Sequence, residues 1–168
     1  KQVAYSYELA IAIIIYENCN IDLLKGNQII NISDIKRKEV AGLKIINNIT
    51  IRANMAYLSS SLGLVVIDLA NNEVKDTYTV INQDSIDDTN INGCAFLGDS
   101  IIVATNNGLY FANINNSNLT DFNNWTLYHS VYNFYDNIIA SNNELFIDTS
   151  SQIISISINN NTLIQAFS

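Results

Sequence analysis

The chain has 168 residues, of which 48% are hydrophobic, and this is enough to bury a sizeable core, which excludes a largely disordered protein. Its formal net charge is -8 with only eight Lys and Arg residues, which excludes a nucleic-acid-binding surface, because such a surface needs cations to replace phosphate counterions. The longest apolar run, residues 9–16, is much shorter than the roughly 20 residues of a membrane-spanning helix.

A segment of similar pattern occurs four times along the chain. The four copies begin at Glu17, Gly63, Gly108 and Gln152, so successive copies start 46, 45 and 44 residues apart. A period in the mid forties, with short apolar runs and polar turns inside it, is typical of β-propeller blades. We therefore predict an all-β fold, a β-propeller with about four blades of four antiparallel strands each.

The predicted elements follow the repeats in chain order, with no helix beyond a single turn. Apolar strands 64–67 and 101–104 lack alternation, which indicates strands buried on both faces between stacked blades. Residues 32–44 and 82–90 have no apolar period and are predicted to be loops between blades. The predicted blades are residues 1–35, 43–81, 90–130 and 131–168. The strands of the second blade are predicted at residues 46–52, 55–60, 63–69 and 74–80. Those of the third blade are predicted at residues 91–97, 100–105, 108–114 and 125–129.

The repeats begin near the first residue and continue to the last. A closed ring of four blades is one interpretation, and the favoured one is a single partial propeller domain, 1–168, belonging to a larger ring. An open ring exposes an apolar blade face, so we expect this segment to be marginally stable or to self-associate. The chain starts at Lys1 without a Met or a signal peptide, which indicates a mature or truncated piece.

The sequence shows no arrangement of residues that predicts catalysis, a cofactor or a metal. The only histidine, His129, lies in a predicted outer strand without a recurring Cys or His neighbour. Acidic residues Asp84, Asp87 and Asp88 could offer oxygen ligands to calcium, but they lack a calcium-loop spacing, so a solvated loop is the better interpretation. We predict no catalytic, cofactor-binding or metal-binding residue, and not an enzyme.

Several other residues are assigned structural roles. Cys19, placed in a third strand, and Cys94, in a first strand, are predicted to be buried thiols rather than a disulfide. The basic run 36–38 is predicted to be a solvated surface loop. Recurring polar residues are predicted to cap the ends of strands (Asp22, Asp68, Asn113, Ser157) or to form hairpins (59–61, 149–151). Three aromatic residues are predicted to lie in the core: Tyr57, Tyr110 and Phe111. The other aromatic residues are predicted to pack at the junction of the third and fourth blades: Phe122, Trp125, Tyr128, Tyr132, Phe134 and Tyr135.

Several phrases stand out along the chain, in residues 20–24, 26–35, 56–69, 73–78, 108–112 and 119–125. Taken in this order, they are similar to the N-terminal propeller of PorZ-like proteins of the Bacteroidetes, and the resemblance runs from about residue 20 to residue 125. The first repeat departs from the later pattern, because Glu17 stands where Gly63 and Gly108 stand in the others.

The resemblance implies a larger exported protein with two propellers, seven-bladed, and a C-terminal β-sandwich. It also implies a non-enzymatic component of the type IX secretion system at the cell surface and outer membrane, whose partners are a sortase and other attachment-complex proteins. Anionic lipopolysaccharide or a glycan is the implied ligand. Two alternatives stay open: the periplasmic glycan-sensing propeller of a hybrid two-component system, and a glycan-active propeller enzyme, for which no convergent pair of carboxylates is visible.

Overall fold

The computed structural model describes residues 1–78, 90–129, 135–142, 144–149, 152–157 and 162–167. These residues form four sheets of four antiparallel strands, and each sheet is built from four strands consecutive in sequence. The strands are β1 (Gln2–Ser6), β2 (Ile11–Ile15), β3 (Ile21–Lys25) and β4 (Gln28–Ile32) in blade 1, β5 (Ile46–Arg52), β6 (Met55–Ser60), β7 (Gly63–Asp68) and β8 (Glu73–Tyr78) in blade 2, β9 (Ile91–Leu97), β10 (Ser100–Thr105), β11 (Gly108–Asn113) and β12 (Thr126–His129) in blade 3, and β13 (Asn137–Ser141), β14 (Glu144–Asp148), β15 (Ile153–Ser157) and β16 (Thr162–Phe167) in blade 4.

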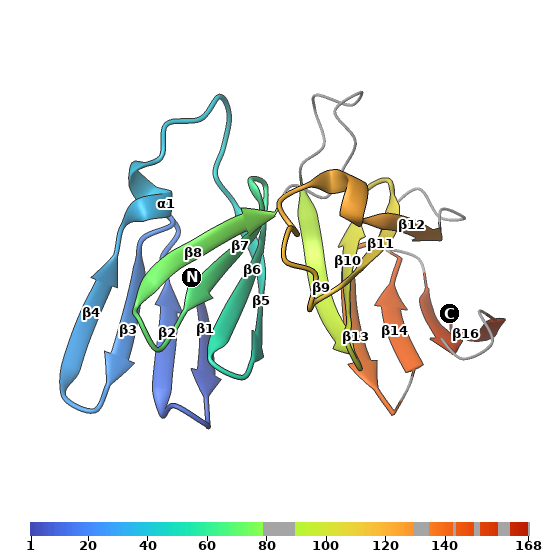
Figure 1. Cartoon of the computed structure of the whole chain (residues 1–168), viewed down its shortest axis with the longest axis horizontal. Helices are drawn as coiled ribbons and strands as arrows, with labels where there is room; N and C mark the ends of the chain where they lie inside the picture. The colour runs from blue at the N-terminus through green and yellow to red at the C-terminus, as the bar shows by residue number, and fades with distance from the viewer. Residues whose placement is uncertain (79–89, 130–134, 143, 150–151, 158–161, 168) are drawn as a thin grey trace.

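The first strand of each blade is the innermost one, and these inner strands contact one another in the order β1, β5, β9, β13. The four sheets therefore fan out from one side (Figure 1), which is the arrangement of neighbouring propeller blades. This confirms the predicted fold class, an all-β propeller with four blades of four strands. Among the described residues, no helix is both long enough and apolar enough to cross a membrane.

The core consists of three apolar layers, one between each pair of neighbouring blades. All six residues of β7 are buried, as the unbroken apolar run predicts for a strand covered on both faces. In contrast, β2 alternates between buried and half-buried residues, because blade 1 has a neighbour on one face only. Its other face displays Val3, Tyr5 and Ile29, which are 66%, 46% and 69% exposed.

The hairpins between second and third strands are built by hydroxyl side chains, as predicted. Ser60 accepts from the Leu62 backbone N–H at 3.1 Å and donates to the Gly63 carbonyl at 2.7 Å. Gly63 has φ of 103°, and a Cβ there would lie 2.5 Å from the Tyr78 carbonyl oxygen, so no other residue fits. Thr149 makes the matching bond to the Gln152 carbonyl, while residues 150–151 lie outside the described part of the chain.

The first blade corrects one part of the predicted register. Residues 16–20 join β2 to β3, whereas only residues 61–62 join β6 to β7, so the first hairpin loop is three residues longer. Cys19, predicted within a strand, consequently lies in this loop, with φ of 60°. The departure of Glu17 from the glycine of the other repeats is explained by this longer loop.

The longer loop also changes the role of one predicted capping residue. Asp68 and Asn113 end their strands and accept hydrogen bonds from the backbone N–H two residues on, at 2.9 and 2.8 Å, as predicted. Asp22 instead lies inside the sheet and accepts from the Tyr16 hydroxyl at 2.9 Å, so its assignment as a cap is wrong. The side chain of Ser157 lies outside the described residues.

The aromatic residues predicted to gather between the third and fourth blades are divided between two layers. Trp125 packs against Tyr78 between blades 2 and 3, with ring centroids 6.4 Å apart, and Tyr135 is fully buried between blades 3 and 4. Tyr57 is buried, as predicted. The Tyr128 side chain and residues 132 and 134 lie outside the described residues, while Phe122, Tyr110 and Phe111 are half-buried.

The predicted loop 32–44 contains a single turn of helix, α1 (Asp34–Arg37). The loop lies at the end of the blades opposite the β1–β2 and β5–β6 hairpins (Figure 1). Lys44 closes it by donating to the carbonyls of Ile35 at 3.2 Å and Lys38 at 3.0 Å. Its basic residues 36–38 are exposed, as predicted, and the second predicted loop, 82–90, falls almost entirely outside the described residues.

Candidate functional site

The inner strands line a hollow in the described structure. A cavity of about 610 Å³ lies between β5, β9 and β13, along the axis of the fan. Its volume is within the range of small-molecule sites. We call it the axial cavity; it is lined by Asn48, Ile49, Thr50, Ile51, Arg52, Cys94, Ala95, Phe96, Gly98, Ile138, Ile139 and Ala140.

Side-chain amides near the start of the inner strands join each blade to the next. Asn47 and Asn92 lie at β-bulges, where the pairing register with the second strand shifts and the amide can turn toward the neighbouring blade. The equivalent residue of blade 4, which also lies five positions before the last residue of its inner strand, is Asp136. Its carboxylate cannot donate a hydrogen bond to another blade. The joining bonds run from Gln2 Nε2 to the Ile46 carbonyl (2.7 Å), from Asn47 Nδ2 to the Ile91 carbonyl (2.8 Å) and from Asn92 Nδ2 to the Tyr135 carbonyl (2.7 Å).

A side-chain contact joins β5 to β13 at Asn48, one of the residues that line the axial cavity. Asn48 Nδ2 donates to Asn137 Oδ1 at 2.7 Å. Asn137 Oδ1 also accepts from the Ile138 backbone N–H, and Asn48 Oδ1 accepts from the Ile49 backbone N–H. On β9, Gly93 leaves room for Asn137 and Ile138 of β13, because a Cβ on residue 93 would lie 2.8 Å from Asn137 Oδ1 and 3.0 Å from the Ile138 nitrogen. The glycine thus sets the distance between β9 and β13.

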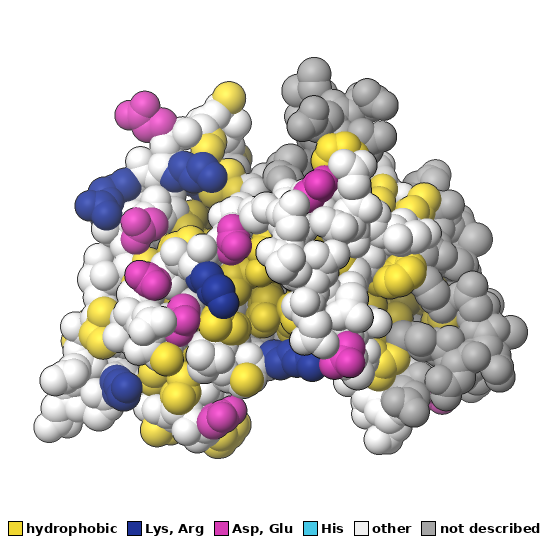
Figure 2. All heavy atoms as spheres, in the orientation of Figure 1, with side chains coloured by type: hydrophobic (Ala, Val, Ile, Leu, Met, Phe, Trp, Pro, Cys, Tyr) yellow, Lys and Arg dark blue, Asp and Glu magenta, His cyan; other side chains and the backbone are white. Residues whose placement is uncertain are grey.

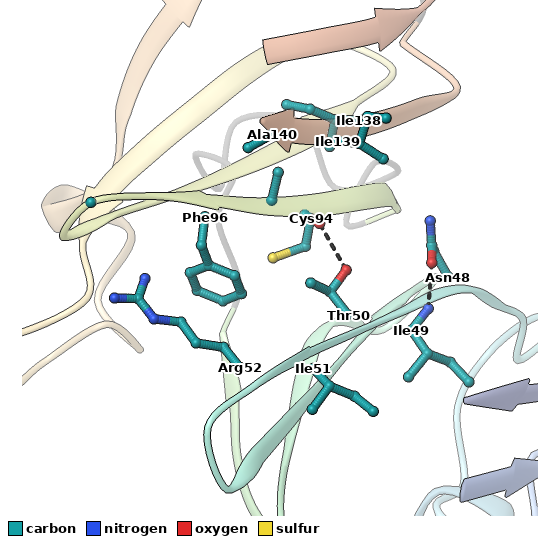
Figure 3. Close-up of a pocket in the computed structure, with 12 residues that line it drawn as sticks. Asn48, Ile49, Thr50, Ile51, Arg52, Cys94, Phe96, Ile138, Ile139 and Ala140 are labelled. Carbon is teal, nitrogen blue, oxygen red and sulfur yellow. Dashed lines mark hydrogen bonds between the residues drawn. The ribbon is translucent and has the colours of Figure 1, made fainter. Parts of the chain in front are cut away.

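The wall between β5 and β9 is fixed by a second polar contact. The Thr50 hydroxyl donates to the Cys94 carbonyl at 2.8 Å (Figure 3). Burial raises the pKa of the Cys94 thiol well above its usual value, so the thiol stays neutral and packs as a small hydrophobe. Cys19 is also buried and free, and its thiol donates to the Lys44 carbonyl. Both cysteines therefore have the structural role that was predicted for them.

A cation and an aromatic ring, Arg52 and Phe96, also line the cavity. The Arg52 guanidinium carbon lies 4.9 Å from the centre of the Phe96 ring, beside which it is drawn in Figure 3. Phe96 is in turn held by Tyr57, whose ring meets it edge to face at 4.7 Å. Burial is the main cause that raises the pKa of Tyr57 to about 12, with smaller contributions from Tyr78 and Cys94.

The basic side chains of the face shown in Figure 2 lie singly rather than in a patch. Among the described residues, no group of three or more His, Cys, Asp and Glu side chains could hold a metal ion.

None of the residues weighed for chemistry in the sequence is among the described residues that line the axial cavity. Asp84, Asp87 and Asp88 lie outside the described residues, and so does the side chain of His129, whose backbone ends β12. Arg52 and Asn47 were not singled out from the sequence. The 45-residue interval between Asn47 and Asn92 was a signal for the amide contacts, whereas a single Arg before a hairpin resembles any surface residue.

Comparisons with known proteins agree on the architecture. A family profile described as TSS9, PorZ, N-terminal beta-propeller domain matches residues 1–126. A solved structure of PorZ from Porphyromonas gingivalis, described as an essential bacterial surface component of the type-IX secretion system, superposes with a TM-score of 0.81 at 21% identity. That match covers 96% of this chain and 21% of the PorZ chain, so this chain spans about a fifth of that protein's length.

Other propellers share the fold at lower similarity. The extracellular domain of a candidate hybrid two-component system from B. thetaiotaomicron matches with a TM-score of 0.68 and 14% identity, over 99% of this chain and 21% of its own. Sqt1 of Saccharomyces cerevisiae matches with a TM-score of 0.67 and 13% identity, over 96% and 46%. No curated protein matches the chain in sequence. Because the family profile spans residues 1–126 of 168, the chain belongs to the family of the N-terminal β-propeller domain of PorZ.

Proposed function

We propose that this propeller is a non-enzymatic binding and scaffolding module of the type IX secretion system, acting in the cell-surface attachment complex. The observation that carries the proposal is the family match over residues 1–126. The PorZ structure with the same fold is described as a surface component of that system, which supports an exported, outer-membrane-associated location for this protein. The proposed partners are a sortase and other attachment-complex proteins, and the proposed ligand is anionic lipopolysaccharide.

The architecture suits a scaffold. Amide bonds from Gln2, Asn47 and Asn92 cross each blade boundary, in addition to three apolar layers, so the blades hold their loops in fixed relative positions. Loop 33–45 projects from one end with Leu43 82% and Ile45 50% exposed. Exposed apolar side chains on a loop tied down by Lys44 are a suitable surface for a protein partner.

We also propose that residues 1–168 are one part of a larger, seven-bladed ring, with blades at about 1–35, 43–81, 90–130 and 131–168. The uncovered blade faces support this. Ile139 and Ile153 of blade 4 are 60% and 49% exposed, and Val3 and Ile29 of blade 1 are more exposed still. Further blades would bury these side chains.

Affinity capture tests the scaffolding role. The full-length protein, tagged and isolated from detergent-solubilised outer membranes, should co-purify with sortase-complex subunits. Leu43→Asp should reduce that recovery, because it places a charge on the exposed loop, while Leu127→Asp, a change at another exposed leucine on β12, should not. Recovery of the protein free of these subunits, with its fold intact by circular dichroism, would contradict the proposal.

A second candidate is the periplasmic glycan-sensing propeller of a hybrid two-component system. It is favoured by the fold likeness to such an extracellular domain over 99% of the chain. Sequencing the gene beyond Ser168 separates the two candidates. A transmembrane helix followed by a histidine kinase would select the sensor, whereas a second propeller and a β-sandwich would select the secretion component.

A further inference from the structure

Arg52 is an unusual residue for the axis of this propeller, because its charge has no counterpart. Its Nη1 atom is buried and has no hydrogen-bond partner in the described structure. The ion pair found among the described residues joins Arg37 to Asp34 in α1 and does not involve Arg52. A buried guanidinium N–H that lacks an acceptor costs free energy, so such a group is expected to have a partner when the protein works.

The contact with Phe96 fixes the guanidinium without satisfying it. Stacking on a ring engages the face of the guanidinium, at 4.9 Å here, and provides no acceptor for its N–H groups, so the Nη1 atom stays without a hydrogen bond. Phe96 itself is held by Tyr57. Arg52 is one of the residues that line the axial cavity, and its guanidinium is held beside the Phe96 ring (Figure 3).

No carboxylate among the cavity-lining residues neutralises this charge, since all twelve are neutral except Arg52. The next residue after Gly98 at the rim is Asp99, which is exposed and forms no ion pair with Arg52 in the described structure. In a chain with a net charge of -8, an unpaired cation beside a cavity of about 610 Å³ is a specific feature.

We propose that the axial cavity binds a small oxyanion, a carboxylate or phosphate group, whose oxygens accept hydrogen bonds from the Arg52 guanidinium. The planar fork of arginine matches the paired oxygens of these groups, and charge-assisted bonds of this kind are stronger than neutral ones. The inference concerns the cavity alone and does not depend on the secretion role, so its failure would leave the scaffolding proposal standing.

The test is titration of the full-length protein with inorganic phosphate, acetate and glucuronate, with glucose as the uncharged comparison, at a constant ionic strength of about 0.1 M. Isothermal calorimetry gives the affinity, and amide chemical shifts of Thr50 and Phe96 locate the site. We expect saturable binding of at least one anion, no binding of glucose, and shifts confined to the cavity. Preference for phosphate would assign the phosphoryl class, and preference for acetate or glucuronate the carboxylate class.

Variants connect the binding to the guanidinium. Arg52→Gln should weaken binding by at least about tenfold, and Arg52→Lys, which keeps the charge but loses the fork, by a smaller factor. Arg37→Gln is the matched control, because it removes an exposed arginine in α1, and it should bind like the wild type. If Arg52→Gln does not fold, Arg52→Lys still reports on the fork. Equal affinity of the wild type and the folded Arg52 variants, or no saturable binding of any anion, would overturn the proposal.

Discussion

The amide contacts between blades give the sharpest test of how this propeller is held together, and Asn47→Asp probes one of them with almost no change in shape. In the wild type, Asn47 Nδ2 donates to the Ile91 carbonyl at 2.8 Å and to Asn90 Oδ1 at 2.9 Å. An ionised aspartate can donate neither bond, and it places a negative oxygen against two acceptors.

The expected cost follows from these two bonds. Each contributes about 0.5–1.5 kcal/mol, and the facing acceptors lose a partner, so the free energy of unfolding should fall by about 2–3 kcal/mol. For a chain of this size, 1 kcal/mol corresponds to roughly 2–4 °C, so Tm should fall by roughly 5–10 °C. Below about pH 4 the deficit should shrink, because a protonated aspartate regains one donor.

Thermal unfolding followed by tryptophan fluorescence is the suitable assay. The chain's single tryptophan, Trp125, packs against Tyr78 in the same blade 2–3 layer that Asn47 bridges. Asn116→Asp is the matched control: it adds the same charge in an exposed turn where the residue only accepts, from the Asn118 N–H at 3.0 Å. A Tm for Asn47→Asp within about 1 °C of that control would show that the amide bonds of Asn47 do not stabilise the blade contact, since even one lost bond should shift Tm further.

Three further predictions follow from the packing. Gly93→Ala should lower the free energy of unfolding by about 1–3 kcal/mol in urea titrations, because its Cβ would lie 2.8 Å from Asn137 Oδ1; an unchanged midpoint would contradict this. The pKa of Tyr57 is raised from 10.0 to about 12 by folding, so its contribution to stability is complete below pH 10 and is lost as pH rises through 12. Tyr57→Phe should therefore flatten the fall in Tm over that range. Parallel curves of Tm against pH for the wild type and the variant would contradict this. The chain should self-associate through the uncovered face of blade 1, and Ile29→Glu on that face should shift sedimentation toward the monomer. A wild-type monomer with a sharp, concentration-independent melt would contradict this.

The strand pattern was predictable because short apolar runs and tight turns determine it locally. The predicted ranges 46–52, 55–60, 91–97 and 100–105 coincide with β5, β6, β9 and β10. Blade 1 was misaligned because the loop of residues 16–20 is longer than its counterparts, and a fixed repeat period cannot register such an insertion. Asp22 was therefore assigned to the wrong end of its strand.

The candidate site was less predictable than the fold, because it depends on contacts between residues far apart in sequence. Asn47 reaches the next blade only because a β-bulge turns its side chain, and the bulge is a property of strand pairing rather than of the residue. Arg52 reads as an ordinary residue before a hairpin, and its lack of a partner is visible only when β5, β9 and β13 are brought together.

The most direct test of the proposed role is cross-linking mass spectrometry on intact cells that produce the full-length protein. We expect cross-links between exposed lysines of the loop that follows blade 1, Lys36 and Lys38, and subunits of the type IX attachment complex, including its sortase. Cross-links from these lysines to a histidine kinase, or none to any subunit of that complex while other surface lysines such as Lys25 react, would contradict it.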